Sequence, residues 1–175
     1  MNKIMQALFF SLLFSVTAGA QDASSKRTIS LSADAGFYLF SHWVSGTQLN
    51  VLAQAQFPIA HKFAVTTTTG IGIAPAKAFY RQSLKEAYGI SAGKYLPLWI
   101  GGRYYFYKNL HADVDLGADV KISQLASTQF HFSPGIGYAV PVGKSGFFNA
   151  STHYITGFKR GTSSFDLRFG YMFPF

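Results

Sequence analysis

The feature that most constrains the fold is a strict alternation of apolar and polar residues near the end of the chain. From Phe165 to Phe175 every second residue is apolar, and the residues between them include Asp166 and Arg168. Successive side chains of a β-strand point to opposite faces, so this segment is predicted to be a strand with one apolar and one polar face. A helix would scatter the same residues over both of its sides.

The same alternation recurs in seven earlier segments. We expect strands over residues 27–39, 48–57, 62–73, 94–106, 110–122, 128–140 and 146–155. In 62–73 the run Thr66–Thr69 makes both faces alike, so the pattern is weakest there. Segments of about 10–13 residues suit a tilted strand, which needs roughly 9–11 residues to cross a membrane's hydrocarbon core.

The links between these segments alternate in length. The short links span 58–61, 107–109 and 141–145, whereas the others span 41–46, 74–93, 123–127 and 156–163. Outer-membrane barrels have short periplasmic turns and longer extracellular loops. The sequence therefore predicts an all-β protein, an eight-stranded antiparallel up-and-down transmembrane β-barrel with both ends of the mature chain in the periplasm.

The first twenty residues differ from the rest and predict a signal peptide. Lys3 precedes an apolar stretch that ends near Val16, and small residues follow at Ala18–Ala20. A membrane anchor is the alternative, but this stretch is shorter than the roughly 20 apolar residues of a spanning helix. We expect residues 1–20 to be removed and 21–175 to form one barrel domain, without cysteines, cofactor or nucleic-acid partner.

The chain is 49% hydrophobic and 17% aromatic, which is unusual for a soluble secreted domain. Large aromatic residues lie near the ends of the predicted strands on the apolar face, as in the two interfacial girdles of membrane barrels. The opposite face should line the lumen, and its charged residues form a predicted network: Asp34, Arg103, Asp113, Asp115, Asp119, Lys121, Asp166 and Arg168. The alternative is a secreted lipocalin-like barrel whose apolar face points inward.

The short link 107–109 predicts how the strands 94–106 and 110–122 on either side of it pair with each other. If Phe106 pairs with Leu110, then Arg103 lies opposite Asp113, and Trp99 lies opposite the side-chain-free Gly117. Both pairs would point inward, where opposite charges neutralise each other. An eight-stranded barrel is about wide enough for side chains to fill it. We therefore expect a plugged lumen and no open pore.

The signal peptide, the eight segments and the terminus Phe165–Phe175 together resemble the small outer-membrane β-barrel superfamily. It includes OmpA and OmpX types, opacity proteins and porin-like β-barrel domains. The resemblance implies that the barrel-assembly machinery recognises the aromatic end of the last strand, here Tyr171, Phe173 and Phe175. Members include adhesins, tethers, small transporters and lipid-modifying enzymes, so the resemblance does not determine a function.

Two possible sites lie on the lumen face. Ser151 and His153, with Asp166 on the next strand, faintly resemble lipid A deacylase barrels, which carry a serine two residues after the histidine. Ile155 stands there instead, so we expect no enzyme. Asp119, His131 and His153 could bind zinc if Asp119 lies opposite His131, and a hydrogen-bonded lumen cluster is the alternative.

Cations dominate the predicted outer loops, in a chain whose formal net charge is +8. Those placed to contact lipopolysaccharide phosphates are Lys77, Arg81, Lys85, Lys94, Lys159 and Arg160. The alternative is that they are solvated loop charges. Within the longest loop, residues 76–88 have a helix-forming composition and form the best candidate contact surface.

These observations predict a monomeric structural or surface-interaction barrel of the outer membrane. Its expected partners are outer-membrane lipid, lipopolysaccharide and the barrel-assembly machinery. The alternatives are a narrow porin-like solute channel and a lipid A-modifying enzyme.

Overall fold

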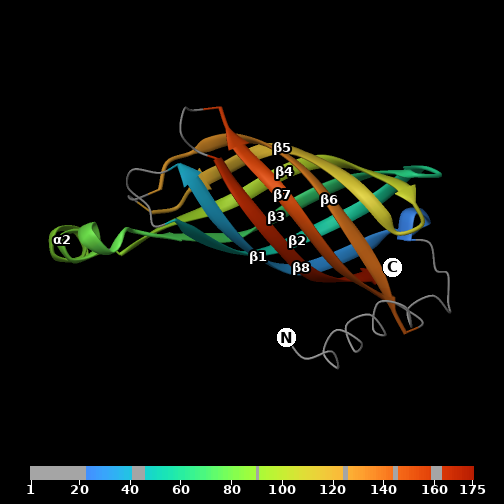
Figure 1. Cartoon of the computed structure of the whole chain (residues 1–175), viewed down its shortest axis with the longest axis horizontal. Coiled ribbons are helices and arrows are strands. Elements are labelled where there is room, and N and C mark those ends of the chain that lie inside the picture. Colours follow the sequence, from blue (N-terminus) through green and yellow to red (C-terminus); the bar gives the residue numbers. More distant parts are fainter. Residues whose placement is uncertain (1–22, 41–45, 90, 124–125, 144–145, 159–162) are drawn as a thin grey trace, which may run out of the picture.

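The computed structural model describes residues 23–40, 46–89, 91–123, 126–143, 146–158 and 163–175. Eight antiparallel strands form a closed barrel in chain order, and β8 pairs with β1 (Figure 1). The strands are β1 Thr28–Phe40, β2 Thr47–Ala60, β3 Phe63–Pro75, β4 Ala92–Tyr107, β5 Leu110–Lys121, β6 Gln129–Val142, β7 Gly146–Gly157 and β8 Ser163–Pro174. All eight predicted strands are confirmed. The predicted signal peptide, residues 1–20, lies outside the described residues.

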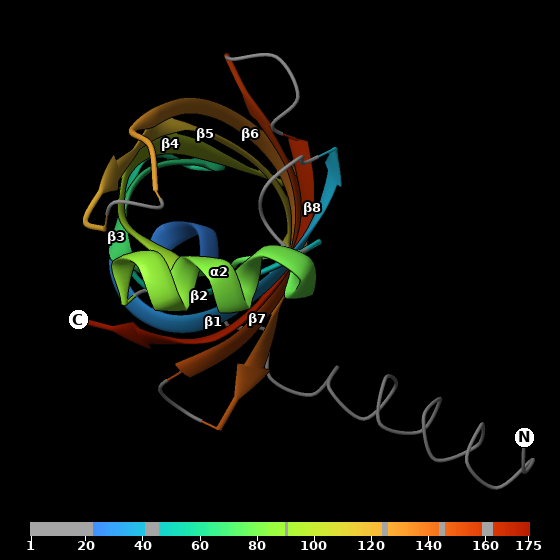
Figure 2. The ribbon, with the colours of Figure 1, turned by 90° about the vertical axis from the view of Figure 1, so that its left-hand side faces the viewer.

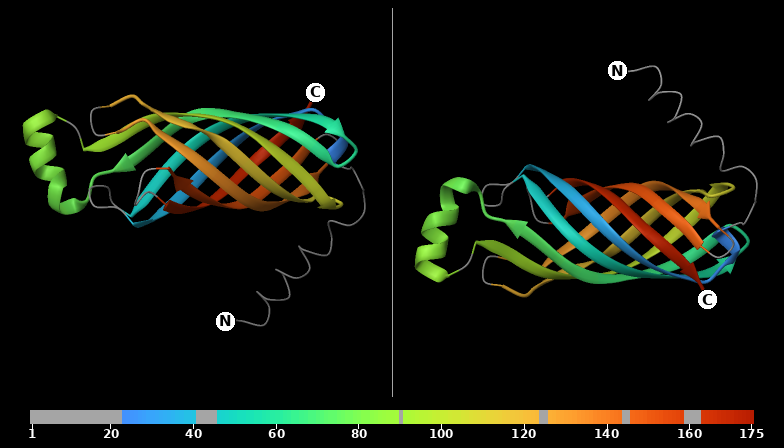
Figure 3. Two further views of the ribbon diagram at one scale, coloured as in Figure 1. Left: turned by 90° about the horizontal axis from the view of Figure 1, so that it is seen from above. Right: turned by 90° about the horizontal axis from the view of Figure 1, so that it is seen from below.

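The two ends of the barrel differ. At the short-turn end, His61–Lys62 connects β2 to β3, Lys108–Asn109 connects β4 to β5, and β6 ends and β7 begins. The 3-10 helix η2, Ala23–Ser25, lies at this end together with the C-terminus (Figure 3). At the long-loop end, helix α2, Ala78–Tyr88, lies beyond the strands and crosses in front of their ring in Figure 2. Among the described residues, no helix is long and apolar enough to cross a membrane.

The longest link is shorter than expected. It spans residues 76–91 rather than 74–93, because β3 and β4 stay paired up to Pro75 and Ala92. The helix predicted within 76–88 is confirmed as α2.

Apolar side chains point outward and polar side chains point into the lumen. Ile29, Leu31 and Ile100 are 51–59% exposed on the outside. Even the run Thr66–Thr69 alternates, with Thr66 and Thr68 buried in the lumen. This arrangement excludes the lipocalin-like alternative, in which the apolar face would point inward.

The register between β4 and β5 confirms the predicted inward pairs, because Arg103 pairs with Asp113 and Trp99 with Gly117. The predicted turn is wrong. Tyr107 pairs with Leu110, and the register shifts between Tyr105 and Tyr107. This irregularity takes up the extra residue of β4 before a two-residue turn, so the pairs deeper in the barrel are unchanged.

Glycines make room for large side chains in the lumen. A Cβ atom at Gly117 would overlap the Trp99 ring, and one at Gly72 would overlap the Tyr95 ring. At these two positions a large inward ring therefore faces a residue without a side chain.

Candidate functional site

A buried arginine organises the part of the lumen near the short-turn end. Arg103 on β4 is 1% exposed and binds Asp113 on β5 through two contacts, Nε to Oδ1 at 2.7 Å and Nη2 to Oδ2 at 3.2 Å. Its Nη1 donates to Gln56 Oε1 at 3.0 Å, and Nη2 donates to Gln54 Oε1 at 3.1 Å. Each guanidinium nitrogen thus has an oxygen partner, which a buried charge requires.

Tyr105, His111 and Asn149 extend this network. The Tyr105 hydroxyl donates to Gln56 Oε1 at 2.9 Å. The ring nitrogens of His111 lie 3.1 Å from Asp113 Oδ1 and 2.9 Å from Asn149 Oδ1. Gln54, Gln56, Tyr105 and His111 were not singled out from the sequence, although they share the period of two of the lumen face.

The short helix η2 closes the short-turn end of the lumen. The Ala23 N–H donates to Asn109 Oδ1 at 3.1 Å, and the Ser24 hydroxyl donates to the His61 carbonyl at 3.0 Å. Ala23 is fully buried in an apolar cluster with Tyr105, Ala139, Phe147 and Met172. The sequence could not predict this contact, because three residues show no periodicity.

A second arginine lies between two carboxylates. On β8, Arg168 Nε and Nη2 each lie 3.3 Å from Asp34 Oδ2, while Nη1 lies 3.9 Å from Asp115 Oδ2. The guanidinium lies 5.5 Å from the centroid of the Trp99 ring. The Thr66 hydroxyl donates to the other Asp115 oxygen at 3.2 Å. This cluster joins the first and last strands, because Asp34 on β1 pairs with Arg168 on β8.

Asp166 is fully buried and is held by neutral donors. Gln48 Nε2 and the Ser164 hydroxyl each donate to it at 2.6 Å. The Tyr95 hydroxyl lies 3.1 Å from Gln48 Oε1 and extends the cluster to β4.

The charged residues of the predicted network thus fall into two groups, Arg103 with Asp113 and Arg168 with Asp34 and Asp115, and Asp166 interacts with Asp34 of the second group. Of the seven acidic residues in the sequence, five lie on the lumen face, namely Asp34, Asp113, Asp115, Asp119 and Asp166. Lys121 is exposed at the end of β5, outside the buried clusters. The lumen thus combines five carboxylates with the two buried guanidiniums of Arg103 and Arg168.

The serine and histidine of β7 do not form a catalytic relay. His153 Nε2 lies 3.1 Å from Ser151 Oγ, and the same nitrogen lies 3.9 Å from Asp113 Oδ2. A relay needs the carboxylate on the opposite ring nitrogen. Although Asp166 pairs with His153 across the strands, it is bound by Gln48 and Ser164.

The register assumed for a zinc site is wrong. Asp119 pairs with Gln129, and His131 pairs with Gly117. The link between β5 and β6 shifts the pairing by two residues, although His131 Nε2 still reaches Asp119 Oδ2 at 2.9 Å. His153 instead lies beside Asp113, and no group of three potential metal ligands occurs among the described residues.

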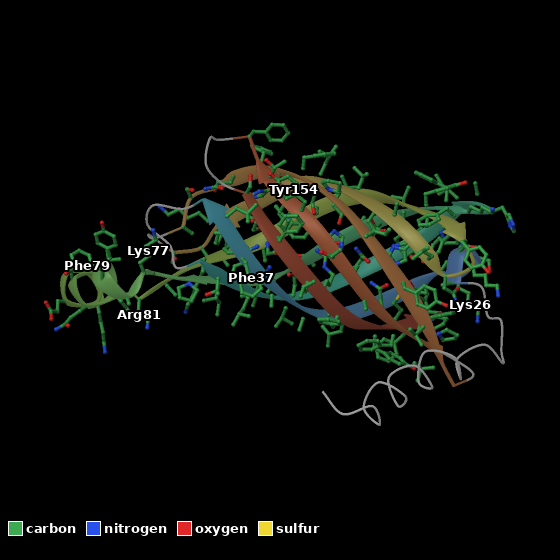
Figure 4. All side chains as sticks on the ribbon, in the orientation of Figure 1. Lys26, Phe37, Lys77, Phe79, Arg81 and Tyr154 are labelled. Carbon is green, nitrogen blue, oxygen red and sulfur yellow. The ribbon has the colours of Figure 1, made fainter. Side chains whose placement is uncertain are left out.

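Helix α2 carries Arg81 and Lys85 four residues apart, which places them on one face, and Lys77 is the residue that caps the start of the helix. Arg81 and Lys85 are exposed, and Arg81 Nη2 donates to the Ala76 carbonyl at 3.3 Å. Phe79, on the opposite face, is 86% exposed. Figure 4 places the labelled residues of this helix at the opposite end of the molecule from Lys26.

Of the remaining predicted contact and assembly residues, Lys94 lies near the start of β4 and Tyr171, Phe173 and Phe175 lie at the end of the chain. Lys94 is exposed near the start of β4, whereas Lys159 and Arg160 lie outside the described residues. At the end of β8, Phe173 and Phe175 are 52% and 64% exposed on the outer wall. The Tyr171 and Phe173 ring centroids lie 4.6 Å apart.

No protein-family model matches the sequence, and no curated protein matches it. The fold is similar to Ail, the attachment invasion locus protein of Yersinia pestis, with a TM-score of 0.58 and 11% identity over 86% of this chain and 99% of Ail. Ail has also been solved in complex with the heparin analogue sucrose octasulfate. The outer membrane protein OprG from Pseudomonas aeruginosa matches with a TM-score of 0.50 and 10% identity, over 86% of this chain and 94% of OprG.

At these identities the similarity concerns architecture. The closed barrel and its similarity to Ail and OprG confirm, for the fold, the resemblance drawn from the sequence. This chain has the fold of the small eight-stranded outer-membrane β-barrels.

Proposed function

We propose that this protein is a monomeric integral barrel of the outer membrane, with a structural or surface-binding role. The observation that carries the proposal is the distribution of side chains across the barrel wall. Large apolar residues are exposed around the outside, while six charged residues are buried in the lumen, namely Asp34, Arg103, Asp113, Asp115, Asp166 and Arg168. Exposing this much apolar surface to water would be energetically unfavourable. In a membrane, lipid acyl chains would cover the same surface.

The proposed route to the membrane begins with export and removal of residues 1–20. The barrel-assembly machinery then recognises Tyr171, Phe173 and Phe175 at the end of β8. Exposure of Phe173 and Phe175 on the outer wall supports this step, because a recognition signal must be accessible. Deleting Phe175 should reduce the amount of folded barrel in the outer membrane.

The lumen is proposed to be closed to solutes. Arg103, Tyr105 and Trp99 are 1–6% exposed within it, and η2 covers its short-turn end. These observations support a role other than a channel. No feature of Ser151 and His153 supports an enzyme, since the triad geometry is missing.

We assign surface binding to α2 and propose that its cationic face binds lipopolysaccharide phosphates. Arg81 and Lys85 are exposed on that face, and charge-assisted hydrogen bonds to phosphate are strong. Lys77, Lys94, Lys159 and Arg160 would extend the contact. The complex of Ail with sucrose octasulfate supports the idea that a barrel of this fold binds a highly anionic sugar.

Two experiments test this proposal. Density-gradient fractionation of a Gram-negative host should place the protein in the outer-membrane fraction, in a form whose electrophoretic mobility changes on heating. Recovery as a soluble periplasmic protein would contradict the placement. For the surface role, the double variant R81Q/K85Q should retain less lipopolysaccharide on purification than the wild type, while the variant S83A of the same helix should not differ.

A further inference from the structure

The lumen wall carries buried polar atoms that have no hydrogen-bond partner among the described residues. Four of them are Asp115 Oδ2, Ser133 Oγ, His153 Nδ1 and Arg168 Nη1. Each of these residues is at most 3% exposed. Leaving a buried polar atom unpaired is unfavourable, and most such atoms in folded proteins bind either another protein group or an ordered water molecule.

The strand register brings these four atoms to one side of the lumen. Their strands, β5, β6, β7 and β8, are neighbours in the barrel (Figure 1). Asp115 pairs with Ser133, and Arg168 Nη1 lies 3.9 Å from Asp115 Oδ2. The next inward residue of β6 after Ser133 is Gly135, which pairs with His153, and a Cβ atom there would overlap the imidazole at Nδ1. The four atoms therefore face one region of the lumen.

The contacts of Asp115 and Arg168 leave a gap between them. Asp115 Oδ1 accepts a hydrogen bond from the Thr66 hydroxyl at 3.2 Å and lies next to Gly101 of β4. Arg168 Nε and Nη2 are each held 3.3 Å from Asp34 Oδ2. The distance of 3.9 Å between the two remaining atoms, Oδ2 and Nη1, is too long for a direct hydrogen bond. A buried donor and acceptor separated in this way suit a bridging water molecule.

The mixture of donors and acceptors indicates which ligand fits. Arg168 Nη1 can only donate, the ionised Asp115 Oδ2 can only accept, and Ser133 Oγ can do both. An anion would be repelled by the carboxylate, and a cation would be repelled by the guanidinium. The inward residues beside them on β6 and β7 are small, namely Ser133, Gly135 and Ser151. A small neutral molecule that both donates and accepts satisfies these groups, and water has these properties.

We propose that these four residues bind ordered water, with one molecule that accepts from Arg168 Nη1 and donates to Asp115 Oδ2. His153 extends the site toward the short-turn end, because its Nε2 lies 3.9 Å from Asp113 Oδ2. The bound water therefore lies between the clusters of the two buried arginines. This inference gives the closed lumen a ligand, and it does not depend on the membrane placement, since all four atoms face the lumen.

The test is rotating-frame cross-relaxation between water and the guanidinium groups of the wild-type protein, with isotope-labelled arginine and folded in detergent micelles. Arg103 is the control within the same molecule, because it is as deeply buried and each of its guanidinium nitrogens has an oxygen partner. Arg168 should show a cross-peak to water with the sign of a dipolar contact, and Arg103 should show none. Proton exchange with water gives a cross-peak of the opposite sign.

Two serine variants locate the site. Ser133→Val places methyl groups where the water binds and should remove the Arg168 cross-peak. Ser30→Val is the matched control, because Ser30 faces the lumen from β1 and its hydroxyl donates to the Gln54 carbonyl at 3.4 Å. It should leave the cross-peak unchanged.

Three results would overturn the proposal. They are a wild type without a cross-peak at Arg168, as a direct bond to Asp115 would give, an equal cross-peak at Arg103, and serine variants that behave alike. Heat-modifiable electrophoresis checks that each variant is folded. If Ser133→Val does not fold, the comparison of the two arginines in the wild type still decides.

Discussion

The two ends of this barrel differ in how far their side chains are buried and joined to one another. At the short-turn end, Arg103 has a partner for each nitrogen, and η2 contributes hydrogen bonds to two different turns. At the long-loop end, α2 extends beyond the strands, with Phe79 86% exposed and with Arg81 and Lys85 in solvent. Stability should therefore depend on the first region and surface binding on the second.

The largest expected effect is a loss of stability when the buried arginine of the short-turn end is removed. Arg103→Leu leaves Asp113 as an uncompensated buried charge, so the free energy of unfolding should fall by about 3–5 kcal/mol. Urea unfolding in lipid vesicles measures the change. The double variant R103L/D113L should recover much of the lost stability. If Arg103→Leu alone is as stable as the wild type, stability does not depend on the short-turn end.

A smaller effect is expected where η2 contacts the β4–β5 turn. Asn109→Ala removes the acceptor of the buried Ala23 N–H, which should cost about 1–3 kcal/mol. The same unfolding assay applies, with Lys85→Ala on α2 as the control. If Asn109→Ala destabilises no more than that control, η2 does not contribute to closing the short-turn end.

Neutralising the cationic face of α2 should weaken surface binding and leave the stability of the barrel nearly unchanged. R81Q/K85Q should change the free energy of unfolding by no more than about 0.5 kcal/mol, as is usual for surface substitutions, while binding to lipopolysaccharide micelles weakens severalfold. Titration at low and high salt measures the binding. If the wild type and the variant bind lipopolysaccharide equally well, α2 is not the surface that recognises it.

The smallest effect concerns the helix itself. Gln82 Nε2 donates to Glu86 Oε1 at 3.0 Å, one turn along the exposed surface of α2. Gln82→Ala should cost the helix at most about 0.2–0.5 kcal/mol and should leave the unfolding midpoint of the barrel unchanged. A measurable shift of the midpoint would mean that α2 is coupled to the barrel more tightly than its position suggests.

The alternation of residues predicted the strands and their inward face, because a period of two determines which side each residue faces. The short link 107–109 predicted the Arg103–Asp113 pair, which holds although the turn itself is one residue shorter than expected. The alternation did not predict register across longer links. Asp119 was expected opposite His131 and pairs with Gln129, since a link of unknown conformation can shift the pairing by two residues without moving any side chain to the other face. The contacts of Ala23 were missed because they depend on how three turns meet in space.

Single-channel recording in planar lipid bilayers tests the central claim, a lipid-embedded barrel whose lumen is closed by its own side chains. Purified, folded wild type should insert and produce no stable openings, because Arg103, Trp99 and Tyr105 occupy the lumen and η2 covers one end. Insertion can be verified independently by protection of the strands from protease. Steady openings of one defined conductance in the wild-type protein would contradict this account.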